Sequence, residues 1–224
     1  MNPNPIEILL DAVEVRVVAA LVEKEITTPD YYPLSLNALV NACNQSSNRD
    51  PVTSHGEPAV KRALESLRDK KLAFVFEGAA NRVAKYGVKL AETLALSRPE
   101  VAVLCVLMLR GPQTVGEIRG RAGRLHGFAA LDEVESTLEA LTARSPRPLV
   151  VRLPRQAGFK EPRYAHLLAG PPEAGSPVAA TDAAGGVEGT PADRLARLEA
   201  AVADLRRELM ELRARFGDLN RPPG

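Results

Sequence analysis

Part of this chain occurs twice. Residues 10–24 (LDAVEVRVVAALVEK) align without a gap with residues 96–110 (LSRPEVAVLCVLMLR), so each residue matches the one 86 positions later. Each copy opens with an N-cap candidate, Asp11 or Ser97, followed three residues later by a glutamate, which is the capping-box pattern of a helix start. The chain must therefore fold in a way that accommodates the same helix in two places.

The repeat continues through two more helices and a hairpin. Residues 36–43 match 115–122, and residues 60–67 match 134–141, with apolar residues at helical spacing in each segment. After each third helix the apolar residues alternate, which predicts strands over residues 72–77, 82–88, 149–153 and 163–168. Three short helices followed by a hairpin form the winged-helix plan. We therefore expect a mostly α fold with small β hairpins (α+β), built as two tandem winged-helix units plus a C-terminal coiled-coil helix.

Composition divides the chain into four parts. The two winged-helix units are predicted over residues 8–90 and 91–170, and residues 171–189, rich in Pro, Gly and Ala, are predicted to be a flexible linker. Residues 190–220 are predicted to form an amphipathic coiled-coil helix, because apolar residues alternate three and four positions apart. Its seam consists of Leu195, Leu198, Val202, Leu205, Leu209, Leu212 and Phe216. The seam favours a homo-oligomer; packing on a partner or on the body, and a mostly frayed tail, stay open as alternatives.

The composition fits a helical cytoplasmic protein. Aromatic residues make up 4% of the chain and Trp is absent, so the core must consist mainly of Leu, Val and Ala, which favours helices. The chain begins without a basic leader, and no apolar run reaches the roughly 18 residues that a membrane-spanning helix needs. We therefore expect a cytoplasmic protein that does not enter a membrane. Cys43 and Cys105 lie on apolar helical faces, which predicts buried free thiols, with a redox or metal-binding role as the alternative.

Several segments resemble one bacterial family. They include VEKEITTPDYYPLSLNALVNACNQSSNRDPV (22–52), PEVAVLCVLMLRGPQTVGEIRGRAGRL (99–125) and PRPLVVRLPRQAGFKEPRYAHLLAG (146–170). On these residues the chain is similar to the YceH family of uncharacterised bacterial proteins, over roughly residues 8–170. The resemblance implies a pair of winged-helix units and implies no particular activity. Where the family usually has Lys in the polar turn this chain has Ser46, which weakens a phosphate-contact role for that turn.

Nothing in the sequence predicts catalysis. His55, His126 and His166 are scattered, and none has a Cys or carboxylate partner at the spacing of a metal site. The sequence contains no Gly-rich phosphate loop, nucleophile elbow or paired acidic motif. We therefore expect neither an enzyme nor a bound cofactor or metal.

Charge allows nucleic-acid binding only through local patches. The chain has 29 Lys and Arg against 28 Asp and Glu, far from the strongly basic character of a dedicated DNA binder. One patch combines the third helix and the hairpin of the first unit: Lys61, Arg68, Lys71, Arg82 and Lys85. The helix cations are expected on the outer face, because the apolar positions of this helix must face the core. The alternative is an ordinary solvated surface, in which Glu57, Glu65 and Asp69 balance the cations.

A long polar stretch separates the second and third helices of the first unit. Its candidate DNA contacts are Asn44, Gln45, Asn48 and Arg49, because such side chains form hydrogen bonds with base edges and phosphates. The same residue types form turns and cap helices without a ligand, so both interpretations stay open. Pro51 disfavours the α conformation at the residue before it, which predicts that the third helix begins near Glu57.

The second unit carries a different distribution of charge. A second basic patch combines Arg119, Arg121 and Arg124 of its second helix with Arg155, Lys160 and Arg163 of its hairpin. Its third helix is acidic, with Asp132, Glu133, Glu135 and Glu139, and would repel phosphates. The leading hypothesis is a DNA-binding, transcription-regulator-like oligomer that uses the first unit on double-stranded DNA. The alternative is a protein-interaction module whose winged-helix units are docking surfaces for a protein partner.

Overall fold

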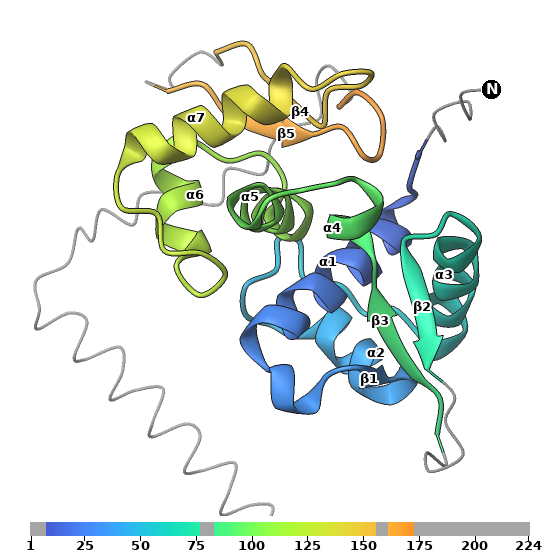
Figure 1. Cartoon of the computed structure of the whole chain (residues 1–224). Helices are drawn as coiled ribbons and strands as arrows, with labels where there is room; N and C mark the ends of the chain where they lie inside the picture. The colour runs from blue at the N-terminus through green and yellow to red at the C-terminus, as the bar shows by residue number, and fades with distance from the viewer. Residues whose placement is uncertain (1–7, 77–82, 156–160, 173–224) are drawn as a thin grey trace, which may run out of the picture. The chain divides into compact units, whose positions relative to one another are not determined.

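The computed structural model of the chain describes residues 8–76, 83–155 and 161–172. These residues form a mixed α+β body that lies within one compact unit, Met1–Ser176 (Figure 1). Arg82, Lys160, the predicted coiled-coil helix and nearly all of the predicted linker lie outside the described residues.

Three helices and then two strands occur in each half, as the repeat predicts; the sequence did not predict three further short elements. The first half contains α1 (Ala12–Thr27), the 3-10 helix η1 (Pro29–Tyr31), β1 (Leu34–Ser35), α2 (Leu36–Asn44), α3 (Glu57–Asp69), β2 (Ala73–Phe76) and β3 (Lys85–Val88). A short helix, α4 (Leu90–Thr93), leads into the second half, which contains α5 (Arg98–Arg110), α6 (Val115–Ala122), α7 (Leu131–Thr142), β4 (Val150–Arg152) and β5 (Tyr164–His166). The start of α3 at Glu57 confirms the position inferred from Pro51.

Capping boxes fix the start of the repeated helix in both halves, as predicted. The Asp11 carboxylate accepts a hydrogen bond from the Glu14 N–H at 2.8 Å, and the Glu14 carboxylate accepts one from the Asp11 N–H at 2.7 Å. At the start of α5 the Glu100 carboxylate accepts from the Ser97 N–H at 2.8 Å. These bonds occupy backbone donors that a helix start leaves without intrahelical partners.

An ion pair joins the first and third helices within each half. The Lys70 ammonium lies 2.6 Å from the Glu14 carboxylate, and the Arg144 guanidinium lies 3.3 Å from the Glu100 carboxylate. Glu100 is the repeat counterpart of Glu14, and Arg144 follows the end of α7 as Lys70 follows the end of α3. Both cations also donate to a backbone carbonyl at matching positions, Leu9 and Ala95. The duplication therefore extends to individual polar contacts.

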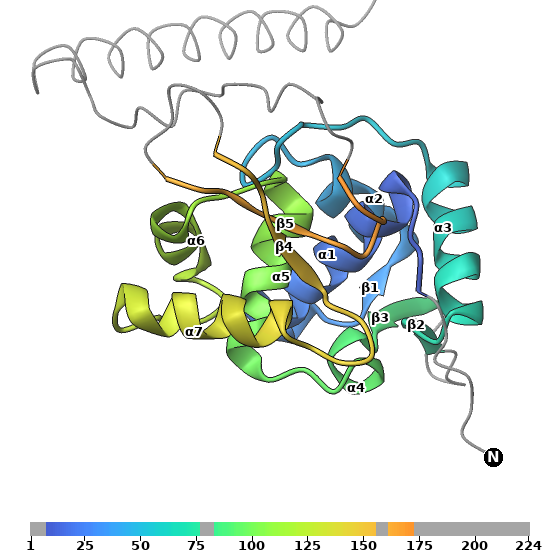
Figure 2. The same cartoon turned by 90° about the horizontal axis from the view of Figure 1, so that it is seen from above.

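The two copies of the repeated helix, α1 and α5, pack against each other in the centre of the body (Figures 1 and 2). Both helices are buried on nearly every side, since each packs on its own half and on the other half. The Cys105 thiol donates to the Ala19 carbonyl at 3.6 Å, and Ala19 is the residue that the repeat matches to Cys105. Contact between matched residues is what a local two-fold arrangement produces. The predicted units 8–90 and 91–170 thus share one hydrophobic core.

The described strands form one small antiparallel sheet in each half. In the first half the strand order is β1-β3-β2, and in the second half β4 pairs with β5. Leu34 of β1 pairs with Tyr86 of β3, and an isolated bridge joins Gln113 to Tyr164 of β5. Gln113 lies 79 positions after Leu34, which is also the offset between α2 and α6. The single bridge of Gln113 therefore corresponds to the pairing of β1 with β3 in the first half.

Gly87 of β3 shows how one strand pair depends on residue size. It pairs with Phe74 of β2, and a Cβ atom at Gly87 would lie 2.2 Å from the Phe74 ring. The matching pair in the second half is Val151 and Ala165, where the smaller Val leaves room for a methyl group. The glycine is therefore required by its aromatic partner.

Cys43 and Cys105 are buried free thiols, as predicted. Burial raises the pKa of Cys43 to about 12 and also raises the pKa of Cys105. A thiol with a raised pKa stays protonated at neutral pH and is a poor nucleophile. Both cysteines therefore act as packing residues in this fold.

Candidate nucleic-acid interface

The outer side of α3 carries cations that the sequence predicts as DNA contacts. The buried residues of this helix are Val60, Ala63, Leu64 and Leu67. Helical periodicity turns Lys61, Arg62 and Arg68 away from them, and all three are exposed. In both views α3 lies at the rim of the described body, beside β2 (Figures 1 and 2).

Lys70 and Lys71 are adjacent in sequence and differ in role. The Lys70 ammonium donates to the Glu14 carboxylate and to the Leu9 carbonyl, so it forms part of the ion pair that joins α1 to the end of α3. Lys71 is exposed, and its backbone has a φ of 59° where the chain turns out of α3. We use the term α3 face for Lys61, Arg62, Arg68 and Lys71 together.

Anions balance part of this charge. Glu57, Glu65 and Asp69 are also exposed on α3, so the helix itself has three cations and three anions. The positive excess comes from residues that follow the helix, beginning with Lys71. The α3 face is therefore a local patch and no extended basic surface.

The hairpin adds cations near α3. Lys85 is half-buried in β3, where it pairs with Phe76 and Ser35. Lys89 follows β3 directly; its Nζ lies 6.0 Å from the centre of the Phe74 ring, and its backbone N–H donates to the Leu72 carbonyl at 2.8 Å. Sequence reasoning missed Lys89, although its position just after a predicted strand was a usable signal.

The structure buries Arg49, which corrects its assignment as a DNA contact. Its side chain is 0% exposed, and its guanidinium lies 2.7 Å from the Glu23 carboxylate of α1. The same group donates to the Ala42 carbonyl at 2.7 Å, near the end of α2. A guanidinium held in this way is unavailable to a ligand at the surface.

The side chain of Asn44 also serves the polar loop itself. Its amide donates to the His55 carbonyl at 2.8 Å and accepts from the His55 N–H at 2.8 Å, which closes the loop just before α3. Gln45 donates to the Ser47 carbonyl at 2.9 Å. These contacts correspond to the turn-forming interpretation of the polar stretch and correct the assignment of Asn44 as a base or phosphate contact.

The same loop is attached to the second half of the molecule. The Asp50 N–H donates to the Leu109 carbonyl at 2.9 Å, and Arg110 donates to the Asn48 side-chain oxygen at 2.7 Å. Asn48 has a φ of 57°, a left-handed conformation that Asn tolerates well. The long polar stretch therefore connects α2 to the end of α5, and Asn48 joins the two halves.

The second half presents a different surface. Asp132, Glu135 and Glu139 of α7 are exposed, as expected for an acidic third helix. The second predicted basic patch is divided by internal contacts. Arg163 lies 3.1 Å from the Glu117 carboxylate, and Arg119 donates to the Ala129 carbonyl at 2.9 Å.

Other kinds of site have little support in the described part of the chain. Across residues 8–76, 83–155 and 161–172, no group of three or more His, Cys, Asp or Glu side chains is placed to hold a metal ion. Within these same residues, no helix is long and apolar enough to span a membrane.

Sequence comparison assigns the chain to a family. The model described as "Protein of unknown function, DUF480" matches residues 10–159, which include the first half and the second half as far as β4. The chain belongs to this family. The expected membership in a family of uncharacterised bacterial proteins is thus confirmed.

Relatives of this chain occur in several bacteria. A UPF0502 protein of Opitutus terrae is 58% identical over 205 residues, which cover 92% of this chain and 85% of the relative. A UPF0502 protein of Citrifermentans bemidjiense is 55% identical, covering 86% of this chain and 88% of the relative. A UPF0502 protein of Pelobacter propionicus is 54% identical, covering 92% and 94%. The similarity therefore extends over most of each protein.

Proposed function

We propose that this protein is a DNA-binding, transcription-regulator-like protein without enzymatic activity. In this proposal the body consists of two tandem winged-helix units, which is the fold that its resemblance to the YceH family implies. The observation that carries the proposal is the α3 face, four exposed cations on and just after the third helix of the first half. The sheet order β1-β3-β2 beside this helix supports the winged-helix interpretation. A DNA-binding role agrees with the cytoplasmic location expected from the sequence.

In the proposed complex α3 enters the major groove of double-stranded DNA. Lys61, Arg68 and Lys71 bind DNA phosphates. Two cations of the hairpin, Lys85 and Arg82, make further contacts with the DNA backbone. Phosphate contacts of this kind position a protein on DNA and make its affinity depend on salt.

The polar loop has an indirect role in this proposal. Asn44 ties the loop to His55, directly before the start of α3, and Arg49 anchors it to α1. The loop therefore fixes where α3 begins. Of the four candidate contacts in the loop, Gln45 keeps a place near the proposed interface.

The first test is binding to random-sequence duplex DNA, measured by fluorescence anisotropy between 50 and 200 mM salt. If the five predicted cations (Lys61, Arg68, Lys71, Arg82 and Lys85) each contact one phosphate, affinity should fall by about 500-fold over this range. The triple variant Lys61→Gln/Arg68→Gln/Lys71→Gln leaves two contacts, so its affinity should fall by only about tenfold.

A control variant removes the same charge elsewhere. Arg98, Arg152 and Arg155 are exposed cations of the second half, and the variant Arg98→Gln/Arg152→Gln/Arg155→Gln should keep the wild-type salt dependence. Equal losses in both triple variants would show that the α3 face has no special role. Absence of binding at 50 mM salt and micromolar protein would leave either a DNA site of high sequence selectivity or the protein-docking role.

Self-association is a second part of the proposal. The seam from Leu195 to Phe216 supports a coiled coil over residues 190–220. Deleting residues 190–224 should reduce the molar mass measured by light scattering and leave the helical circular dichroism of the body intact. If the number of chains per particle is the same with and without residues 190–224, the coiled coil does not cause self-association and this part of the proposal fails.

A protein-docking role is the second candidate function. The observation in its favour is α7, whose exposed face carries Asp132, Glu135 and Glu139, with Leu131 44% exposed at its start. Such a face would suit a basic protein partner better than DNA. Capture of a partner that is lost in Glu135→Lys/Glu139→Lys, but kept in the α3 triple variant, would favour this candidate.

A further inference from the structure

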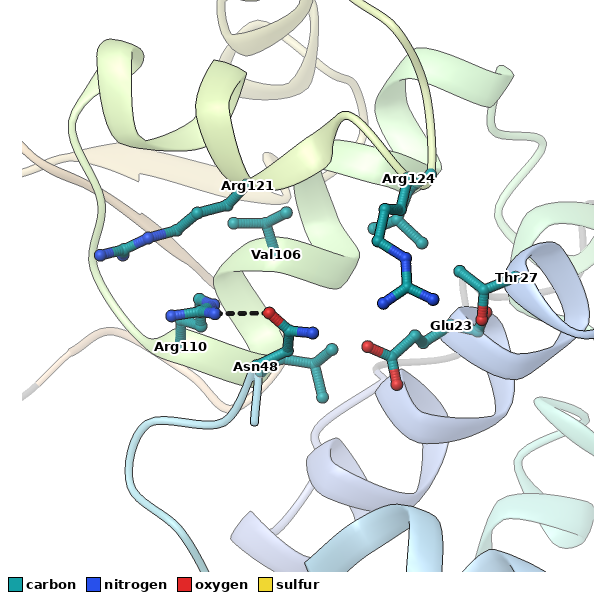
Figure 3. Close-up of a pocket in the computed structure, with 9 residues that line it drawn as sticks. Glu23, Thr27, Asn48, Val106, Arg110, Arg121 and Arg124 are labelled. Atoms are coloured by element: carbon teal, nitrogen blue, oxygen red, sulfur yellow. Dashed lines mark hydrogen bonds between the residues drawn. The ribbon is translucent and has the colours of Figure 1, made fainter. Parts of the chain in front are cut away.

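A small pocket opens between the two halves, near the end of α1 and the ends of α5 and α6 (Figure 3). Val106, Leu109 and Leu125 contribute apolar lining. Arg110, Arg121 and Arg124 contribute three guanidinium groups. Neither the proposed DNA interface nor the α7 face makes use of this pocket.

The charge of the pocket is positive. Glu23 is the acidic residue in its lining, and its carboxylate already pairs with the buried Arg49 at distances of 2.7 and 3.2 Å. The lining therefore has three arginines and one acid, and that acid is already paired with Arg49. A concave surface with more guanidinium groups than carboxylates attracts anions.

Two of the three arginines contact other side chains of the protein. Arg110 donates to the Asn48 side-chain oxygen at 2.7 Å, and Arg121 lies 3.7 Å from the Glu117 carboxylate. Burial and the nearby charge of Arg121 lower the pKa of Arg110, and the carboxylates of Asp50 and Glu23 act in the opposite direction without outweighing them. Arg124 is exposed and makes no ion pair within the described residues; in Figure 3 its guanidinium points into the space between Asn48 and Glu23.

We propose that this pocket binds a small phosphate-bearing ligand through Arg110, Arg121 and Arg124. The planar guanidinium group forms paired hydrogen bonds with phosphate oxygens, so arginines in the lining of a small pocket suit a phosphate group. The apolar lining accommodates an uncharged part of the ligand. The pocket is small, which favours a ligand with a single phosphate group.

The repeat shows how the two halves differ at the position of the pocket. Near the end of α2, the polar loop brings Arg49 to the Ala42 carbonyl and to Glu23. Ala42 corresponds to Arg121 in the repeat, and the shorter connection after α6 supplies no counterpart of Arg49. The first half therefore fills this position with its own side chain, and the second half leaves a basic opening.

The test follows the side-chain Nε–Hε signals of arginine by NMR while inorganic phosphate replaces chloride at constant ionic strength. The signals of Arg110, Arg121 and Arg124 should shift together and saturate with one Kd. Arg124→Gln and Arg121→Gln should each weaken phosphate binding by about tenfold, as expected for the loss of a charge-assisted hydrogen bond. The control variant Arg98→Gln removes an exposed arginine outside the pocket and should change the Kd by less than twofold.

Several outcomes would overturn this proposal. Arg98 shifting as strongly as the pocket arginines would show non-specific attraction of phosphate to arginine. An unchanged Kd in both pocket variants would place any phosphate site elsewhere. A parallel titration with duplex DNA separates the sources of phosphate: if DNA shifts the pocket signals and inorganic phosphate does not, the ligand is nucleic acid and the proposal of a small ligand fails.

Discussion

The two halves of the molecule share their internal joints and differ on their outer faces. Glu14 with Lys70 and Glu100 with Arg144 join the first helix to the end of the third helix in the same way. The exposed side of α3 carries cations among its anions, whereas the exposed side of α7 carries only acids. Duplication thus preserved the contacts that hold each half together and left the surfaces free to diverge. Any difference in function between the halves resides at those surfaces.

One interior difference accompanies the surface difference. Glu23 of α1 pairs with Arg49 of the polar loop, whereas the repeat counterpart of Glu23 is the apolar Leu109. The second half has a shorter connection and needs no buried cation at this place. The extra residues of the first half therefore brought their own ion pair into the core.

Removing this ion pair should have the largest effect on stability. Arg49→Met leaves the Glu23 carboxylate buried and removes the donor to the Ala42 carbonyl. Breaking a buried ion pair from one side typically costs about 4 kcal/mol of unfolding free energy. Urea denaturation followed by circular dichroism would measure the loss.

The comparison between halves supplies the matching rescue. Glu23→Leu places in α1 the residue that α5 has at Leu109, so Glu23→Leu/Arg49→Met should recover at least half of the stability lost in Arg49→Met. Replacing both partners of a buried pair by apolar residues is often neutral. A double variant as unstable as the single one would mean that Arg49 acts mainly through the Ala42 carbonyl.

Sequence alone was sufficient for features that depend on local spacing. The capping boxes at Asp11 and Ser97 and the start of α3 at Glu57 follow from residues close together in the chain. The exposure of Lys61 and Arg68 follows from the apolar positions of their own helix. Periodicity decides such features, so they can be read without a structure.

Features that depend on distant partners were missed. Arg49 looks like an exposed loop cation until Glu23, 26 residues earlier, is seen beside it. Helical periodicity selects Lys71 for the outer face, but it does not show that the buried Glu14 holds Lys70. The pocket needs four separate segments, so no local pattern indicates it.

The next largest loss of stability is expected from breaking the ion pair that joins the first helix to the end of the third helix in each half. Glu14→Gln should lower the free energy of unfolding by about 3 kcal/mol, because the side chain of Glu14 is 3% exposed and its ion pair with Lys70 is lost. Glu100→Gln should cost about half as much, since Glu100 is 13% exposed and its pair is longer. Equal losses, measured by urea denaturation at pH 7, would show that the two joints are equivalent in energy as well as in position.

The ion pair of Glu14 with Lys70 should also make stability depend on pH. Burial acts to raise the pKa of Glu14, but hydrogen bonds from Lys70, Ser66 and the Asp11 backbone outweigh it, so the pKa lies below its ordinary value of 4.5. A lowered pKa contributes stability that is present above pH 4.5 and is lost as the pH falls through the folded-state pKa. The stability of Glu14→Gln should therefore decrease less than that of the wild type below pH 4.5.

His166 offers a smaller difference between the halves. It pairs with Val150 in β4, as Val88 of the first half pairs with Ala73 in β2. Burial lowers the pKa of His166 to about 4, and its Nδ1 is buried without a hydrogen-bond partner in the described residues. The unfolded chain therefore binds a proton more readily, so stability falls as the pH drops from about 6.5 towards 4.

His166→Val gives the second half the residue of the first. The variant should match the wild type at pH 7.5 and exceed its stability by about 1 to 2 kcal/mol at pH 5, since it has no imidazole to protonate. Urea denaturation at both pH values would measure this difference. The same difference between variant and wild type at pH 7.5 and pH 5 would mean that His166 contributes through packing and not through its charge.

The smallest expected effect concerns α7 and decides whether the halves differ in their ligand. Glu135→Gln/Glu139→Gln should change affinity for random duplex DNA by less than about threefold at 100 mM salt, because charges beyond a Debye length of about 10 Å are largely screened. Lys61→Gln/Arg68→Gln should weaken binding by at least tenfold under the same conditions, because it removes two direct phosphate contacts. If neutralising α7 instead strengthens binding tenfold, α7 lies close to the DNA, and both third helices face one ligand despite their opposite charges. The repeat would then be a single two-sided DNA surface in which α7 limits affinity, and its acids would be the residues that prevent non-specific binding.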